Sequence, residues 1–225
     1  MNILVYGDSN SWGYLDDGTG LRAPERWPQL MARTLRGDVC LSEACLPGRT
    51  TAIDDTEMGA FVNGRTHLLP TLLSHQPLDL VIIMLGTNDF KARFNRSAGD
   101  IAQSLFDLAK IVRDAGAGRG RWREGSTPDV CIIAPPALGR RVDDPTWDRS
   151  KEWLNGRAKS LALPTVLRAG CEARRLLFVD ANDSIQSSEL DPIHWCEVSH
   201  QRFGQYMAQT LQPIIDKVSQ RDAQA

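Results

Sequence analysis

The sequence predicts a three-layer α/β/α fold built on a doubly wound, mainly parallel sheet. Two observations lead to this prediction: short apolar runs that are continuous instead of alternating, and longer amphipathic segments between them. A fully apolar strand is buried on both faces, as happens when helices cover both sides of a parallel sheet. Strands and helices alternate along the whole chain without a repeat or a change in composition. We therefore expect a single domain over residues 1–225, with the last few residues forming a flexible tail.

Five segments are expected to form the strands of this sheet. Four are strongly apolar and one, at residues 39–42, is weaker; the strong segments are residues 3–6, 80–85, 130–134 and 176–179. All five have the length of ordinary strands in globular proteins.

Five further segments repeat their apolar residues at helical spacing. The clearest is residues 101–112, where Ile101, Leu105, Leu108 and Val112 fall on one face. The other predicted helices are residues 27–35, 67–74, part of 153–174, and 199–218. Each separates two predicted strands or follows the last, which is the order of a doubly wound fold.

Composition and charge argue against several functions. The formal net charge of −2 gives no electrostatic basis for binding nucleic acid, and no apolar run is long enough to span a bilayer. No basic residue precedes the short apolar run at the N-terminus, so we expect no secretory signal. The five cysteines are an odd number without zinc-type spacing. We therefore expect free thiols, no metal, no cofactor and a cytoplasmic location.

Polar residues that could perform hydrolysis follow the predicted strands. Ser9 comes directly after the first strand, Asn88 follows the strand at 80–85, and Asp191 and His194 lie between the last strand and the last helix. Ligands of open α/β sheets bind beyond the carboxyl ends of the strands, so these side chains are expected on one rim. A serine nucleophile, a histidine base, an orienting carboxylate and an amide that stabilises an oxyanion are the parts needed for serine hydrolysis.

Taken one at a time, the same residues have structural interpretations. Ser9 could cap a helix, Asn88 could close a turn, and His194 could be a loop histidine. Their joint placement at strand ends favours catalysis. A flavodoxin-like nucleotide-binding module, the alternative from another class, would need a phosphate-binding loop, and no such glycine pattern follows any strand.

Four blocks of the sequence resemble those of the SGNH (GDSL-type) hydrolases. They are GDS around Ser9, the glycine Gly48 in LPGRTT, GTND around Asn88, and D-x-x-H from Asp191 to His194. The stretch from Gly48 through GTND is similar to the arylesterase and acyltransferase branch of that family. The resemblance implies that Ser9 is the nucleophile, His194 the base and Asp191 its partner. It also implies an oxyanion hole formed by the Ser9 and Gly48 N–H groups and the Asn88 side chain.

The resemblance further implies a serine esterase that acts on small aryl or acetyl esters through an acyl-enzyme. The alternative uses the same triad as an acyltransferase or perhydrolase, with alcohol or peroxide as acceptor. Asn10 and Trp195 depart from the usual family pattern, and we expect Trp12, Ile193 and Trp195 to line the substrate pocket.

The segment at 137–153 follows the third apolar strand and is expected to form a long loop. It could be a solvated loop whose tryptophans pack on the domain, or it could build a wall of the pocket and contact a neighbouring subunit. Because the related branch includes multimers, we expect a homo-oligomer.

Overall fold

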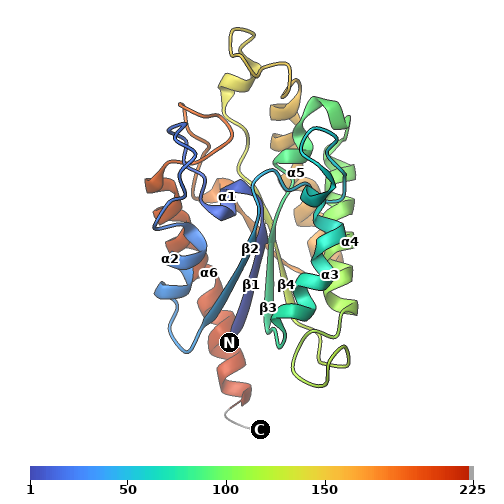
Figure 1. Ribbon diagram of the computed structural model, residues 1–225. Helices are drawn as coiled ribbons and strands as arrows, with labels where there is room; N and C mark the ends of the chain where they lie inside the picture. Colours follow the sequence, from blue (N-terminus) through green and yellow to red (C-terminus); the bar gives the residue numbers. More distant parts are fainter. Residues whose placement is uncertain (223–225) are drawn as a thin grey trace.

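The computed structural model describes residues 1–222, and within them five parallel strands form one sheet in the order β2-β1-β3-β4-β5. Figure 1 shows this sheet between two layers of helices. The strands are β1 (Asn2–Gly7), β2 (Cys40–Cys45), β3 (Leu80–Met84), β4 (Asp129–Ala134) and β5 (Leu177–Asp180). Each strand is hydrogen-bonded in parallel to its neighbours, with Ile3 of β1 opposite both Leu41 and Leu80.

Helices cover both faces of the sheet. One layer contains α2 (Trp27–Thr34) and α6 (Glu197–Asp222), and the other contains α3 (Gly64–His75), α4 (Ala98–Asp114) and α5 (Gly156–Arg174). The remaining helix, α1 (Ser9–Trp12), is a single turn at the carboxyl end of β1. Among the described helices, none has both the length and the apolar character needed to cross a membrane.

Two hydrophobic cores lie on opposite faces of the sheet. Side chains alternate between the faces along each strand, so Leu4 and Tyr6 of β1 enter the core beneath α3, α4 and α5. Ile3 and Val5 enter the core beneath α2 and α6, beside Trp27 and Phe203. This double burial explains why the strands read as continuous apolar runs.

The predicted fold class and the five strands are confirmed, with small differences at their ends. The weak segment at 39–42 is a strand that continues to Cys45. All five predicted helices are present, and α3 begins three residues earlier than the segment predicted at 67–74. The one-turn helix α1 was not predicted, because four residues are too few to show a periodic pattern. The flexible tail expected at the C-terminus falls mainly on residues 223–225, outside the described residues.

The order of the strands marks where a ligand would bind. From β1 the chain passes to β2 on one side and then returns to form β3 on the other side. The crevice at such a reversal is the usual ligand site of doubly wound sheets. Ser9 follows β1 and Asn88 follows β3, so both lie at this crevice.

Candidate active site

Ser9 is held at the rim of the sheet by a tight change from strand to helix. The Asp8 carboxylate caps α1 by accepting a hydrogen bond from the Asn10 backbone N–H at 3.0 Å. Gly13, with a φ of +96°, ends the helix after one turn, a conformation that favours glycine. As the first helical residue, Ser9 has an N–H without an acceptor inside the helix. Its hydroxyl and its N–H therefore both lie at the rim.

His194 joins Ser9 to Asp191. Its Nε2 lies 3.1 Å from the Ser9 Oγ, and its Nδ1 lies 2.6 Å from the Asp191 Oδ2. The other carboxylate oxygen of Asp191 accepts a hydrogen bond from the Ile193 N–H at 2.9 Å. The short loop before α6 thus holds the Asp191 carboxylate through local contacts. Ser9, in contrast, is 185 residues from His194 in the sequence. The structure brings together the three residues that the sequence predicts as a catalytic group.

The electrostatics of the site keep Asp191 ionised. Burial opposes its ionisation, but the hydrogen bond and the charge of His194, the Ile193 N–H and the nearby Arg149 together hold the pKa of Asp191 below its usual range. On the other side of the imidazole, the Tyr14 ring packs at a centroid distance of 4.4 Å. His194 is therefore held between a carboxylate, a serine and an aromatic ring, in the arrangement that serine hydrolysis requires.

Gly48 and Asn88, to which the resemblance assigns the oxyanion hole, line the same cavity as Ser9 and His194. Gly48 follows β2 and has a φ of +83°, and a Cβ there would lie 2.3 Å from the Met58 Cε. A side chain at Gly48 would therefore be strained and would clash. The Asn88 side chain donates one hydrogen bond from Nδ2, to the Arg49 carbonyl at 3.1 Å, which leaves its second N–H for another acceptor.

Asp89 and Thr51 join the loop that bears Gly48 to the loop that bears Asn88. No pattern in the sequence indicates this link. The Asp89 carboxylate accepts hydrogen bonds from the Thr51 N–H at 2.9 Å and its hydroxyl at 2.5 Å, and it pairs with Arg96 at 2.6 Å. Burial raises the pKa of Asp89 despite these partners. The aspartate of GTND was visible in the sequence, but its partners lie 38 and 7 residues away and follow no spacing rule.

The candidate site opens into a cavity of about 200 Å³. Predicted site residues line it together with residues from four loops, and the full lining is Ser9, Tyr14, Pro47, Gly48, Met58, Asn88, Lys91, Arg149, Trp153, Ile193 and His194. Among the described residues, no cluster of three or more histidines, cysteines or acidic residues could hold a metal ion.

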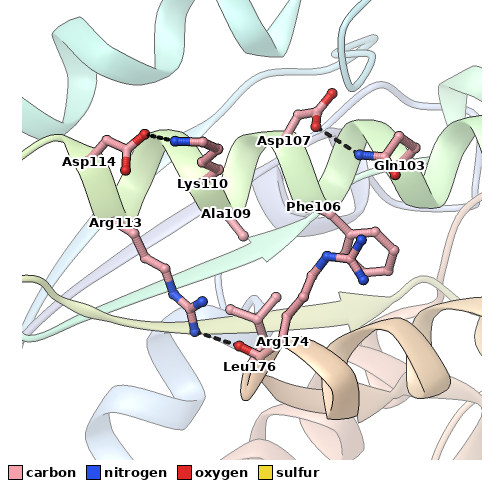
Figure 2. A pocket seen from close by; sticks show the side chains of 9 residues that line it. All are labelled: Gln103, Phe106, Asp107, Ala109, Lys110, Arg113, Asp114, Arg174 and Leu176. Atoms are coloured by element: carbon pink, nitrogen blue, oxygen red, sulfur yellow. Dashed lines mark hydrogen bonds and ion pairs between the residues drawn. The ribbon is translucent and has the colours of Figure 1, made fainter.

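A larger cavity, of about 340 Å³, lies between α4 and the end of α5 (Figure 2). Neither serine nor histidine lines it. Its polar side chains pair with one another, Gln103 with Asp107 and Lys110 with Asp114. This groove therefore lacks the side chains that hydrolysis needs, and the smaller cavity contains them.

Two of the three residues predicted to line the pocket lie elsewhere. Ile193 lines the cavity, but Trp195 is fully buried in the core, edge-on to Phe203 at 5.4 Å. The backbone bends through residues 191–194, so that His194 lines the cavity while the next side chain, Trp195, packs in the core beside Phe203. Trp12 ends α1 and packs beneath Arg22, outside the cavity. The predicted pocket roles of Trp12 and Trp195 are therefore wrong.

The loop at 137–153 supplies a wall of the cavity through Arg149 and Trp153. Trp147 and Trp153 are also buried against the core of the parent domain. Within one subunit the loop therefore does both things that were expected of it: it forms a wall of the cavity, and its tryptophans pack on the domain.

Comparisons with known proteins identify the family and the fold of the chain. The model of the GDSL-like lipase/acylhydrolase family matches residues 5–202. A carbohydrate acetylesterase from Sinorhizobium meliloti superposes with a TM-score of 0.86 at 34% identity, covering 95% of this chain and 99% of that one. An aryl esterase from M. smegmatis gives 0.85 at 33% identity, covering 94% and 98%. An arylesterase from Vibrio mimicus is 30% identical over 149 residues, 65% of this chain and 62% of its own length.

The fold and the Ser–His–Asp group define a serine-type carboxylic ester hydrolase. More narrowly, the chain belongs to the GDSL-like lipase/acylhydrolase family, whose model matches most of its length.

Proposed function

We propose that the protein is a serine esterase in which Ser9 attacks the ester carbonyl. His194 accepts the proton of the Ser9 hydroxyl through Nε2 as the new C–O bond forms, and Asp191 holds the imidazole through Nδ1. The tetrahedral intermediate collapses when His194 returns this proton to the departing alcohol, which leaves an acyl-enzyme on Ser9. A water molecule, deprotonated by His194, then releases the acid and regenerates the serine.

The negative charge that develops on the carbonyl oxygen needs donors on the side of Ser9 away from His194. We assign this role to the N–H groups of Ser9 and Gly48 and to the free side-chain N–H of Asn88. Supporting this assignment, all three residues line one cavity with His194, and Asn88 is held in place through its other N–H. Fixed donors of this kind stabilise a transition state without reorganising during the reaction.

The substrates that we propose are small esters with an acetyl or similarly short acyl group and an aryl or carbohydrate alcohol. A cavity of about 200 Å³ has room for a short acyl chain. The relatives named above are aryl esterases and a carbohydrate acetylesterase, so they favour hydrolysis over transfer to an alcohol or peroxide.

The observation that carries this proposal is the contact of His194 with both Ser9 and Asp191, at 3.1 and 2.6 Å. Turnover of an aryl acetate by Ser9→Ala and His194→Ala tests it, and we expect each kcat to fall by at least about 10³-fold. Ser11→Ala is the matched control, since Ser11 is buried two residues away with its hydroxyl unpaired among the described residues. Equal losses in Ser9→Ala and Ser11→Ala would contradict the assignment.

We further propose a cytoplasmic homo-oligomer of this single domain, assembled around the mouth of the cavity. Apolar side chains are exposed there beside lining residues: Met58 and Phe61 on one loop, Leu154 next to Trp153, and Leu190 next to Asp191. The five cysteines are free, which suits a reducing compartment. Light scattering should give a mass that is a multiple of 25.0 kDa, and a monomer at assay concentration would contradict the assembly.

A further inference from the structure

We propose that the site prefers esters whose alcohol portion carries a negative charge, and that Arg149 is the residue that selects for this charge. The inference rests on the proposed esterase function and narrows its substrate class.

The first observation is the sign of the charges that face the cavity. Apart from His194 and Tyr14, the ionisable residues that line it are Lys91 and Arg149, and both are cations. Within residues 1–222 no aspartate or glutamate belongs to the lining. The carboxylates near these cations lie outside the lining: Glu152 and Asp55 pair with them directly, and Asp191 interacts with Arg149 at longer range. Lys91 and Arg149 therefore give the cavity a positively charged wall.

Lys91 and Arg149 differ in how completely nearby carboxylates neutralise their charge. Lys91 is buried, its side chain only 6% exposed, and it pairs with Glu152 at 3.4 Å and Asp55 at 4.0 Å. Arg149 bonds to Glu152 through Nε alone, at 3.0 Å. Glu152 also pairs with Arg93 at 3.4 Å, so one carboxylate serves three cations. Lys91 is thus a neutralised structural cation, and Arg149 retains charge for a ligand.

The guanidinium of Arg149 is held in position with its outer edge free. It packs over the Trp147 and Trp153 rings, 5.7 Å from each centroid. Neither of its terminal Nη groups has a hydrogen-bond acceptor among the described residues, and the side chain is 42% exposed. Two parallel N–H donors on a fixed planar group match the geometry of a carboxylate, a phosphate or a sulfate.

The position of Arg149 indicates which part of the ester should carry the charge. In the proposed reaction His194 protonates the leaving alcohol, so the alcohol lies on the His194 side and the carbonyl oxygen on the Gly48 side. Arg149 lies near enough to Asp191 to favour the ionised carboxylate. Arg149 and His194 also line the same cavity, so we assign Arg149 to the alcohol portion of the ester.

A pair of matched substrates tests this inference: 3-acetoxybenzoate, which is anionic, and 3-acetoxybenzamide, which is neutral. The measured quantity is the ratio of their kcat/KM values, so differences in overall activity between variants cancel. For Arg149→Gln we expect this ratio to fall about 3–5-fold, the upper part of the range for one partly exposed ion pair. For Arg149→Lys, which keeps the charge but loses the planar fork, we expect an intermediate ratio. Raising the salt concentration should lower the wild-type ratio and leave that of Arg149→Gln unchanged.

Lys151→Gln is the control, because it removes the same charge from an exposed position two residues away that does not line the cavity. Its ratio should stay within about twofold of the wild-type ratio. An unchanged ratio in Arg149→Gln, or an equal fall in Lys151→Gln, would overturn this inference alone. Failure of the wild-type protein to cleave either ester would overturn the proposed function, and this inference with it.

Discussion

The Asn88 side chain donates a hydrogen bond to the backbone carbonyl of Arg49, 3.1 Å away. The Arg49 side chain in turn donates from Nη1 to the Gly7 carbonyl at 3.1 Å and to the Ala44 carbonyl, at the ends of β1 and β2. Its guanidinium stacks on the Tyr6 ring at 4.1 Å. Arg49 thus connects the strand before Ser9, the loop that bears Gly48 and the Asn88 amide. The three proposed oxyanion donors depend on one buried arginine for their relative positions.

Replacing Arg49 should therefore impair catalysis more than binding. In Arg49→Lys the positive charge remains, but an ammonium has no planar group to stack on the Tyr6 ring, so the donor to the two carbonyls is no longer held in place. We expect kcat to fall about 10-fold or more with little change in KM, because the loss acts on the transition state. Arg65→Lys, at an exposed position of α3, is the control. A folded Arg49→Lys variant with wild-type kcat would show that Arg49 does not position the donors.

Asn88→Ala removes one proposed oxyanion donor directly. We expect kcat to fall by about 10²–10³, the usual loss for such a donor, and KM to stay close to the wild-type value. Asn88→Asp should be at least as impaired, since it keeps the shape but replaces both N–H donors with an acceptor. Steady-state kinetics on one aryl acetate distinguish the possibilities. A rise in KM at unchanged kcat would make Asn88 a substrate-binding residue instead.

Asp8 should make the protein less stable as the pH rises. Burial raises the pKa of Asp8 to about 7, against 3.8 for the ordinary side chain, and the nearby Asp89 adds to this shift. The folded state therefore holds a proton that the unfolded state releases above about pH 4, so stability declines between about pH 4 and 7. Asp8→Asn removes this cost and keeps the cap on the Asn10 N–H.

Urea unfolding at several pH values measures the effect. Asp8→Asn should gain about 1–4 kcal/mol over the wild-type protein at pH 8, and the gain should vanish near pH 4. Asp17→Asn is the control: Asp17 is exposed, its pKa is lowered by hydrogen bonds to Thr19, and its removal should give no gain. A gain that does not change with pH would mean that Asp8 is ionised throughout.

Met58 should limit the length of the acyl chain. It lies against Gly48 and lines the cavity together with Ser9, so we expect it to contact the acyl group carried by Ser9. For Met58→Ala we expect the ratio of kcat/KM for a hexanoate ester to that for an acetate ester to rise about 10-fold, since a few methylene groups gain space. Leu69→Ala removes an exposed apolar side chain of α3 that does not line the cavity, and it should leave the ratio unchanged. An unchanged ratio in Met58→Ala would place the acyl group elsewhere.

The sheet and the triad could be predicted from the sequence because each leaves a local signal. Strands buried on both faces are continuous apolar runs, and Ser9, Asn88 and His194 directly follow or precede recognisable elements. The Asp191–His194 contact spans only three residues, so a tight turn suffices to make it. Topology then brings Ser9 to His194 without any further information in the sequence.

The contacts of Arg49 and the lining of the cavity could not be predicted, because the partners are backbone atoms or side chains far away in the sequence. Arg49 bonds to carbonyl groups, which every residue has, so no residue type reveals the interaction. Trp195 was misplaced because the sequence does not show which face of a loop each neighbour takes. Arg149 and Trp153 enter the cavity only because the long loop folds back over the rim.

In the proposed reaction Ser9, activated by His194, becomes the covalent acyl carrier. Labelling with an aryl phosphonate ester, followed by mass spectrometry of the tryptic peptide at residues 1–22, identifies the nucleophile directly. Fragmentation of this peptide distinguishes a label on Ser9 from one on Ser11. We expect one adduct, on Ser9, that forms rapidly in the wild-type protein, at least about 10²-fold more slowly in His194→Ala, and not at all in Ser9→Ala. An adduct on another residue, or equal labelling of the wild-type protein and His194→Ala, would contradict the account.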